Sequence, residues 1–334
     1  MKSNIEVGIV GIGRTGSEHL NFYSKKKEIS KIYISEKKKY KKKLKNTKII
    51  IDPELKIFNK SYKKKLVSIS NFDYDHFRYL IKNFNKHHIF VEKPMCYNFK
   101  ELRKIIQISK KKKYKNLVYS NLVLRGAKIF NDIKKKIYKG EFGKIYYFEA
   151  DYIYGRLNKI RNGWRGDKNF YSPILGGGIH MVDLMIDFLN EIPSDVITYS
   201  NKIVTKKDNF HFDDFFQSNF FFKSKAIAKI TTNFGAVHNH QHVVKIFGTK
   251  KSFIYDDKGA RIFRYRDPYK SKKLNINKLY KGKDCLLPKV FQLIKSKKYY
   301  KKENLREINL MSTVLSAVKS NKINAKVKIK QFYD

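Results

Sequence analysis

The feature that most constrains the fold is a short apolar segment that runs directly into closely spaced glycines. Residues 5–10 (IEVGIV) have the length and composition of a buried strand, and a helical pattern follows over residues 17–27. Between them stand six residues that we predict to lie beside a bound cofactor: Gly11, Ile12, Gly13, Arg14, Thr15 and Gly16. In such a strand–turn–helix unit the glycines permit a tight turn, close approach of backbone to a pyrophosphate, and packing of helix on strand. The pattern therefore predicts a dinucleotide-binding turn, with the phosphates at the helix N-terminus.

An acidic residue at the end of the second predicted strand indicates which dinucleotide the turn binds. The strand covers residues 32–35 and is followed by Glu36, which stands 20 residues after Gly16. A carboxylate at that spacing binds the adenosine ribose hydroxyls, so we predict NAD as the cofactor. The three lysines at positions 37–39 follow at once and could pair with a 2′-phosphate, so NADP remains possible.

The third predicted strand adds residues to the same site. It covers residues 66–70 and breaks at Asn71, and a helix follows. Ligands of parallel sheets bind outside the carboxyl ends of the strands. We therefore place Ser70, Asn71 and His76 beside the cofactor.

The fourth predicted strand ends in the most informative short motif of the chain, Glu92-Lys93-Pro94. The apolar run at residues 89–91 has the composition of a buried parallel strand, and Pro94 lacks the donor that a central strand needs to continue. The strand must therefore stop at Lys93, at the edge where ligands bind. We predict that Glu92 and Lys93 contact the cofactor and that Lys93 is also a catalytic cation.

The two halves of the chain have different patterns, and together they predict an α/β fold. Strands and helices alternate over about the first 115 residues, which is typical of a parallel sheet. Strand patterns then follow one another with few helices between them, at residues 145–154, 196–204, 214–222, 226–234, 243–247 and 252–255. We predict an N-terminal Rossmann dinucleotide-binding domain at residues 1–120 and a C-terminal α+β domain with a large, mostly antiparallel sheet at residues 121–334.

Charge and composition exclude several classes of function. The formal net charge is +45, yet the lysines fall in short runs spread over the chain, so we expect no specific binding to nucleic acid. The positive field favours anionic small ligands such as nucleotides and phosphorylated or nucleotide-linked sugars. The chain has only two cysteines, which favours a reducing compartment. It contains no run of about 18 apolar residues, so we predict no membrane span. We expect a cytoplasmic protein with no membrane partner.

The order of motifs along the chain resembles that of the Gfo/Idh/MocA family of NAD(P)-dependent oxidoreductases. Besides the glycine turn, Glu92-Lys93-Pro94 matches the family's EKP signature. Further similar segments are KGEFGKI at residues 139–145, Trp164-Arg165, GIHMVDL at residues 178–184 and FGTKKS at residues 247–252. The resemblance implies that the second domain binds substrate and forms a homo-oligomer, either a dimer or a tetramer. It also implies that Trp164 and Arg165 contact the cofactor.

The resemblance further implies a mechanism in which Lys93 and His180 act on a sugar carbinol over the nicotinamide ring. A secondary alcohol is a poor proton donor, so hydride loss from its carbon requires a base on the oxygen. Histidine titrates near neutrality, and His180 is the expected base. Lys93 would stabilise the negative charge that develops on the same oxygen. The expected substrates are sugars, cyclitols and nucleotide sugars.

The chain departs from the family at the position four residues before His180. Many members carry an aspartate there, and this chain has Gly176. Asp183, three residues after His180, either orients the imidazole as part of the catalytic set or is a structural carboxylate. The absent aspartate leaves open a different base, a different substrate position or a reaction that runs mainly as ketone reduction.

Four other residues are candidates for substrate binding: Asn121, Arg125, Tyr154 and Arg156. Arg156 and Arg165 are suited to a phosphate or carboxylate group. His238, His240 and His242 alternate along a predicted strand, but no carboxylate or cysteine stands at ligand spacing, so we predict no metal site. Two other classes of function compete with a sugar or cyclitol dehydrogenase, namely a catalytically inactive dinucleotide-binding regulator and a basic nucleic-acid binder. Retention of Lys93 and His180 favours the enzyme.

Overall fold

The computed structural model describes residues 5–36, 48–60, 64–111, 115–166, 171–266, 270–275, 279–296 and 299–333. The chain forms two compact units. The first unit contains residues 1–123, 281–308 and 333–334, and the second contains residues 124–280 and 309–332. The three lysines at positions 37–39, which bear on NADP binding, lie outside the described residues.

The first unit is built on a six-stranded sheet in which all neighbouring strands are parallel. The strands are β1 (Ile5–Val10), β2 (Ile29–Ser35), β3 (Ile49–Ile51), β4 (Lys64–Ile69), β5 (His88–Val91) and β6 (Val118–Ser120). Their order, β3-β2-β1-β4-β5-β6, is that of a doubly wound dinucleotide-binding fold, and it reverses between β1 and β4. The carboxyl ends of β1 and β4 therefore form the crevice in which such folds bind ligands.

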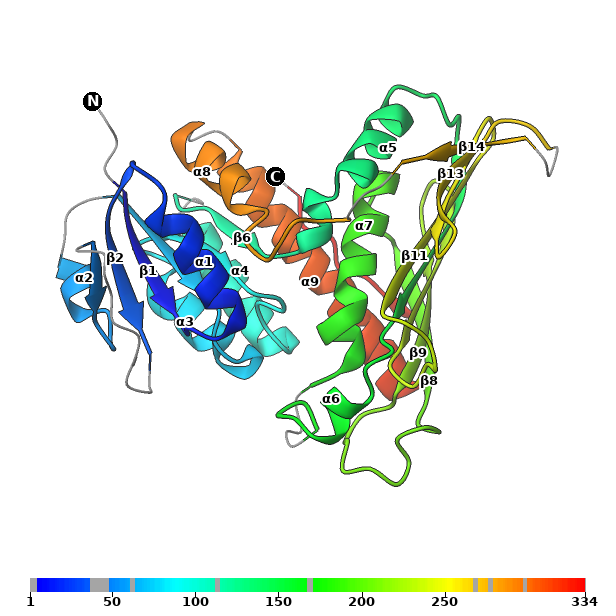
Figure 1. The fold of residues 1–334 in the computed structure, drawn as a ribbon. Coiled ribbons are helices and arrows are strands. Elements are labelled where there is room, and N and C mark those ends of the chain that lie inside the picture. The colour runs from blue at the N-terminus through cyan, green and yellow to red at the C-terminus, as the bar shows by residue number, and fades with distance from the viewer. Residues whose placement is uncertain are drawn as a thin grey trace. The chain divides into compact units, whose positions relative to one another are not determined.

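Helices flank this sheet and bury their apolar sides on it (Figure 1). They are α1 (Arg14–Ser24), α2 (Lys56–Lys60), α3 (His76–Asn83), α4 (Phe99–Lys111) and α8 (Leu287–Ser296), with a short turn η1 (Asp73–Asp75) before α3. In α4, for example, Leu102, Ile105 and Ser109 are buried at helical spacing. One core cluster joins β1, β2 and β4 to α1 and α8, with Ile5, Val7, Leu66, Phe291 and Ile294 among its members.

The division of the chain differs from the predicted boundary after residue 120. Residues 281–308, which we assigned to the second domain, belong to the first unit. Leu287, Val290 and Phe291 of α8 are part of the core cluster of the parallel sheet. An apolar helical pattern shows that a helix has a face to bury, but it does not say which sheet the helix covers.

The edge strand of the parallel sheet is completed by a helix, since side chains of α9 (Tyr300–Ile323) take hydrogen bonds from its backbone. Asn304 Oδ1 accepts from the Val118 amide at 2.7 Å, and Glu307 Oε1 accepts from the Ser120 amide at 3.2 Å. An uncovered edge would offer these donors to another strand. Residues of α9 up to Ile308 belong to the first unit and later ones to the second.

The second unit is built on a nine-stranded sheet of order β14-β13-β12-β11-β7-β10-β9-β8-β15. The strands are β7 (Ile145–Ile153), β8 (Asp195–Asn201), β9 (Phe215–Phe221), β10 (Ile227–Asn233), β11 (Gln241–Gly248), β12 (Ser252–Asp256), β13 (Gly259–Phe263), β14 (Ser271–Leu274) and β15 (Val327–Lys328). Among the described residues of this sheet, β7 and β10 pair in parallel and the other neighbouring strands are antiparallel. The predicted large, mostly antiparallel sheet is confirmed. The strands β13, β14 and β15 were not predicted, because strands of two to five residues give little periodic signal.

Helices cover one face of this sheet (Figure 1). They are α5 (Lys128–Tyr138), the short α6 (Asn158–Arg161), α7 (Ile179–Leu189) and the second part of α9, with η2 (Val123–Gly126) before α5 and a π-helical turn η3 (Ile174–Gly178) before α7. Phe148, Ala150 and Tyr152 of β7 are buried on the covered face, and their neighbours along the strand are half-buried on the other. In the described part of the chain, no helix is long and apolar enough to cross a membrane.

Candidate functional site

The glycine turn of the first unit has the geometry that a dinucleotide requires. Gly11 has a φ of +83°, and a Cβ added there would lie 2.6 Å from the Cα of Asn71. A Cβ on Gly16 would lie 2.0 Å from the carbonyl oxygen of Gly11. Both positions therefore need glycine for the protein's own packing. A Cβ on Gly13 would meet nothing within 4 Å, so the space in front of Gly13 is open to a ligand.

The start of α1 offers donors to an anion. Gly13 caps the helix without a side-chain hydrogen bond, and the first turn contains no acidic residue. The N-terminal amides of a helix lack intrahelical partners and carry partial positive charge. Arg14, the first helical residue, has a side chain that is 82% exposed, and Thr15 beside it is half-buried. This end of α1 fits a pyrophosphate.

Glu36 is tied to the glycine turn by one of its carboxylate oxygens. Its Oε2 accepts a hydrogen bond of 2.8 Å from the amide of Ile12. A carboxylate has acceptor capacity for several donors, so this bond fixes the side chain and is compatible with binding of ribose hydroxyls. The bond also joins the end of β2 to the turn after β1, the two segments that the sequence placed around the adenosine.

The end of β4 closes the other side of the turn. The Ser70 amide donates to the Val10 carbonyl at 2.8 Å, and the Ser70 hydroxyl donates to the Gly11 carbonyl at 2.9 Å. Ser70 is buried, and Asn71 is the residue that packs against Gly11. Both residues restrict the conformation of the turn, Ser70 through its hydrogen bond to the Gly11 carbonyl and Asn71 through packing against Gly11.

The parallel ladder at β5 extends one residue beyond the strand and then stops, as the sequence predicts. The Glu92 amide donates to the Ile69 carbonyl at 2.8 Å, and the Asn121 amide donates to the Val91 carbonyl at 2.7 Å. The Lys93–Pro94 peptide that follows is cis. Lys93 is half-buried where the ladder ends, at the carboxyl edge of the sheet. This is the edge that binds ligands in doubly wound sheets.

His76 joins the loops that follow β4 and β5. Its Nδ1 lies 2.8 Å from the Pro94 carbonyl oxygen, and its Nε2 lies 3.2 Å from the Asn71 carbonyl oxygen. The residue is fully buried. Both ring nitrogens lie against backbone carbonyl oxygens, so His76 links the two loops, and its predicted contact with the cofactor stays a prediction.

A buried polar network lies behind Glu92. The Asn121 amide nitrogen is 2.6 Å from Glu92 Oε1 and 2.7 Å from the Lys283 carbonyl oxygen. His19 Nδ1 is 2.8 Å from the Ser68 hydroxyl, and burial lowers the pKa of His19. Asn121 was predicted to bind substrate, but its amide nitrogen is bound to protein groups and holds Glu92 in place. The contact from Lys283 was not predicted, because it is remote in sequence.

In the second unit, His180 lies in a cluster of aromatic and imidazole rings. It stacks on Tyr152, with ring centroids 6.2 Å apart and planes inclined by 11°. Tyr152 also contacts His240 and His242 at 5.2 and 5.3 Å. Tyr154 packs on Phe234 at 4.6 Å, and Arg156 lies over the Tyr154 ring at 6.0 Å. Tyr154 and Arg156, both predicted to bind substrate, thus adjoin this cluster.

Trp164 and Arg165 extend the ring cluster around His180. The Arg165 guanidinium lies 4.3 Å from the centroid of the Trp164 ring and 5.2 Å from that of Tyr171. Trp164 and Tyr171 meet edge to face at 5.5 Å. Trp164 and Arg165 lie in the second unit, and their predicted contact with the cofactor stays a prediction.

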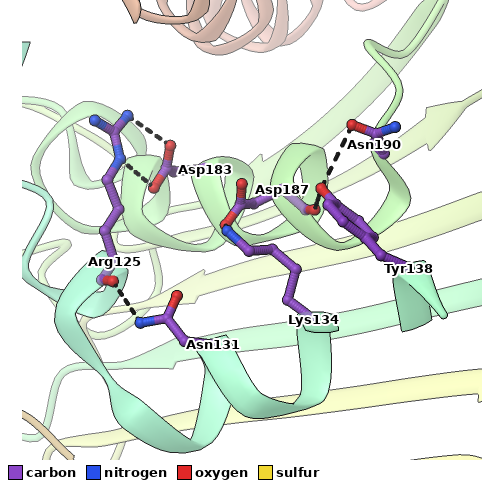
Figure 2. A network of polar contacts seen from close by, with 7 residues as sticks. All are labelled: Arg125, Asn131, Lys134, Tyr138, Asp183, Asp187 and Asn190. Carbon is purple, nitrogen blue, oxygen red and sulfur yellow. Dashed lines mark hydrogen bonds and ion pairs between the residues drawn. The ribbon is translucent and has the colours of Figure 1, made fainter. Parts of the chain in front are cut away.

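Asp183 forms a buried ion pair with Arg125 (Figure 2). Arg125 Nε donates to Oδ2 at 2.9 Å and Nη2 donates to Oδ1 at 2.7 Å, and both side chains are 3% exposed. Of the two roles open to Asp183, this bidentate pair favours the structural one. It also directs Arg125, predicted to bind substrate, at a protein carboxylate.

The pair belongs to a row of polar contacts that joins α5 to α7 (Figure 2). Lys134 Nζ donates to Asp187 Oδ2 at 2.7 Å, one helical turn beyond Asp183. Tyr138 donates to the Asp187 carbonyl oxygen at 2.8 Å. Residues four apart share a helix face, so α7 turns one polar face to α5. This row fixes the rotation of the helix that presents His180.

Comparison with known protein families now identifies the chain. Residues 5–120 match an oxidoreductase family with an NAD-binding Rossmann fold, and residues 130–254 match the GFO/IDH/MocA C-terminal domain. The chain belongs to the Gfo/Idh/MocA family of oxidoreductases. Its first unit is an NAD-binding Rossmann domain, and NAD(P) is the cofactor class that the glycine turn and Glu36 predicted.

Solved structures of similar fold agree with this assignment. A levoglucosan dehydrogenase in complex with NADH has a TM-score of 0.78 and 16% identity, with 98% of this chain and 100% of that chain covered. The myo-inositol 2-dehydrogenase from Lactobacillus plantarum has a TM-score of 0.73 and 15% identity. An oxidoreductase domain protein from Kribbella flavida has a TM-score of 0.80 and 13% identity. Both matches cover 98% of this chain and 100% of the other chain. At such identities the likeness concerns the fold. No curated protein matches the sequence.

Two residues beside the predicted site residues were not identified from the sequence, namely Tyr171 and Lys283. Tyr171 has no motif around it, and only the glycine run at residues 176–178 hinted that a ring packs there. Lys283 reaches the site from the far end of the chain. The histidines near β11 were considered for a metal. Among the described residues no group of three or more His, Cys, Asp or Glu side chains is arranged to hold one.

Proposed function

We propose that this protein transfers a hydride between NAD(P) and a carbinol or ketone carbon of a sugar, cyclitol or nucleotide sugar. The observation that carries the proposal is the placement of His180 in a ring-lined cluster of the second unit, stacked on Tyr152. Aromatic rings present flat apolar surfaces, and a sugar ring offers matching C–H faces with hydroxyl groups at its edge. The nicotinamide, when bound, accepts or supplies the hydride. The residues of this chain bind the proton of the carbinol oxygen and stabilise the negative charge on that oxygen.

In this proposal His180 holds the proton of the carbinol oxygen. A neutral imidazole accepts the proton as hydride leaves carbon, and the imidazolium returns it in the reverse direction. His180 is 5% exposed, so its environment is largely protein. Its stacking on Tyr152 and the fixed rotation of α7 restrict the orientations of its ring.

Lys93 stabilises charge on the same oxygen in the proposed reaction. An ammonium group that donates to a developing alkoxide lowers the energy of the transition state more than that of the bound alcohol. The end of the parallel ladder and Pro94 determine where Lys93 leaves the sheet. The hydrogen bond from Asn121 holds the side chain of Glu92, the residue directly before Lys93.

The charges near the ring cluster favour a substrate that carries an anionic group. Arg165 lies against Trp164 and Tyr171, and the exposed Arg156 lies over Tyr154. Asp183, the acidic residue of α7 nearest to His180 in sequence, is neutralised by Arg125. Guanidinium groups bind carboxylate and phosphate in a bidentate manner. We therefore propose uronates, sugar phosphates or nucleotide sugars ahead of neutral sugars.

The test is a substrate screen that follows absorbance of the reduced nicotinamide. Neutral sugars, cyclitols, uronates, sugar phosphates and nucleotide sugars are offered with NAD and with NADP side by side. We expect turnover with members of the anionic classes and loss of that turnover in His180→Gln. Dinucleotide binding by calorimetry with no turnover on any class would instead mean a binding protein, and failure to bind either dinucleotide would contradict the proposal altogether.

We also propose a cytoplasmic homo-oligomer that associates through the uncovered face of the nine-stranded sheet. Tyr199 and Ile227 on that face are 53% and 44% exposed. Exposed apolar groups on an open sheet are typical of an interface. Light scattering should give a dimer or tetramer, and Ile227→Asp with Tyr199→Asp should reduce the mass. A monomer at all concentrations would contradict this proposal.

A further inference from the structure

The residue one helical turn before His180 has no side chain. It is Gly176, in the π-helical turn that leads into α7. Residues four apart in a helical segment lie on one face, so a side chain at position 176 would be a direct neighbour of the imidazole. This position therefore decides which polar group accompanies His180.

The space beside Gly176 is filled by the phenol of Tyr171. A Cβ added to Gly176 would lie 2.4 Å from both the Cζ and the hydroxyl oxygen of Tyr171. Real Cβ atoms do not approach other atoms so closely, and thus any residue other than glycine would displace the phenol. The adjoining Gly177 is restricted in the same way, since its Cβ would lie 2.5 Å from the Tyr152 ring.

Tyr171 is held firmly in this place. Its side chain is buried, at 3% exposure, and its ring contacts Trp164 at 5.5 Å and Phe234 at 6.2 Å. The Arg165 guanidinium lies 5.2 Å from its centroid. These contacts come from the loop after α6 and from the end of β10. They direct the hydroxyl end of the ring toward the helix face that carries His180.

We propose that the Tyr171 hydroxyl is the polar group that positions His180 in this chain, from the place that a carboxylate at position 176 would otherwise occupy. The proposal rests on the proposed role of His180 as the base. A neutral phenol orients the imidazole by a hydrogen bond but, unlike a carboxylate, does not stabilise the imidazolium. Among the titratable and charged groups of this region, Tyr152 stacks on the His180 ring, and Tyr154, His240 and His242 contact Tyr152. Arg165 contacts Tyr171, and Asp183, three residues after His180 on α7, is paired with Arg125.

The Tyr152 phenol stays neutral in this environment. Burial raises the pKa of Tyr152 well above its ordinary value, and the charge of Arg165 opposes the rise only in part. Tyr152 stacks on the face of the His180 ring, whereas the hydroxyl of Tyr171 stands over position 176. The two tyrosines therefore restrain different motions of the imidazole, tilt by Tyr152 and rotation by Tyr171.

The first experiment compares Tyr171→Phe with the unchanged protein by ¹⁵N NMR of the histidine rings, with the His180 signal assigned from His180→Gln. The ring shifts report protonation and hydrogen bonding at each nitrogen. We expect the titration midpoint of His180 to move by roughly half a pH unit or more, the scale of one neutral hydrogen bond. Tyr255→Phe is the matched control, since Tyr255 packs on Phe130, away from η3, and its loss should leave His180 unchanged. An unchanged His180 signal in Tyr171→Phe would overturn the proposal.

The second experiment exchanges the two groups. Gly176→Asp alone should lower the thermal midpoint because its Cβ meets the phenol, and adding Tyr171→Ala should recover much of that loss. In the double variant a carboxylate within about 4–6 Å should raise the titration midpoint of His180 by about one unit or more. A Gly176→Asp variant as stable as the unchanged protein would overturn the placement of Tyr171. Neither readout requires turnover, so a failure of the proposed reaction is distinguishable from a failure of this inference.

Discussion

Gly13 in the first unit and His180 in the second unit are held by different physical means. The open space at Gly13 follows largely from the backbone, because main-chain hydrogen bonds set the ends of β4 and β5, and the Glu36 and Ser70 side chains bond to the main chain of the turn. His180 is placed by side chains, through its stacking on Tyr152 and through the ion pair that fixes α7. Changes at Gly13 or Lys93 of the first unit should therefore alter ligand binding or turnover with little loss of stability. Changes around His180 should alter both.

The largest expected effect tests the side-chain dependence of the second unit. Arg125→Met leaves Asp183 as a buried, unpaired carboxylate, and the free energy of unfolding should fall by about 3–5 kcal/mol. The double variant Arg125→Met with Asp183→Leu removes both charges and should recover most of that loss. Urea unfolding followed by circular dichroism measures both. A loss in Arg125→Met below about 1 kcal/mol, the scale of a surface pair, would show that this ion pair does not hold α7.

The next effect tests whether different residues of the first unit serve turnover and dinucleotide binding. Lys93→Met keeps the length of the stem and deletes the donor, and turnover should fall roughly 10²-fold or more while dinucleotide affinity changes little. The reason is that the glycine turn and Glu36, not Lys93, hold the pyrophosphate and adenosine in the proposed mode. Lys100→Met, an exposed lysine of α4, is the control and should leave both quantities unchanged. Weaker dinucleotide binding with full turnover at saturation would make Lys93 a binding residue.

Acid should weaken the first unit through a buried imidazole that the site does not use. Burial, aided by the charge of Lys65, lowers the pKa of His87 to about 4, and its Nε2 lies 2.9 Å from Asn59 Oδ1. Because the unfolded chain takes up the proton first, the contribution is complete above pH ~6.5 and is lost as pH falls toward 4. The loss should reach about 2–3 kcal/mol. His87→Gln should flatten this part of the stability profile in urea titrations, and an unchanged profile would contradict the assignment.

The smallest effect compares two glycines of the same turn: the space beside Gly13 is open to a ligand, and the space beside Gly16 is filled by protein atoms. Gly13→Ala should lower dinucleotide affinity about tenfold, since a methyl group forced against a ligand costs about 1–3 kcal/mol. The unfolding free energy should stay level or rise by about 0.4–1 kcal/mol, because alanine reduces the freedom of the unfolded chain. Gly16→Ala is the contrast and should destabilise the fold, as its Cβ meets the Gly11 carbonyl. Equal loss of stability in both variants would remove the distinction.

The sequence by itself determined the parallel sheet of the first unit, its dinucleotide turn and the family. Gly11, Gly16 and Pro94 restrict the backbone locally, so each marks a turn or a strand end that can be recognised from its neighbours in sequence. The predicted parallel sheet, the dinucleotide turn and the family assignment are confirmed. Local rules are readable because they involve neighbours in sequence.

Only the tertiary structure decided how the second unit surrounds His180 and which distant segments complete the first. The pairing of Arg125 with Asp183, the ring of Tyr171 beside Gly176 and the contact of Lys283 with Asn121 join residues by packing and have no spacing rule. The same reason explains why we assigned α8 to the second domain, whereas it packs in the first unit. An apolar face or a glycine run records that something packs there, and the partner is selected by shape and burial once the chain has folded.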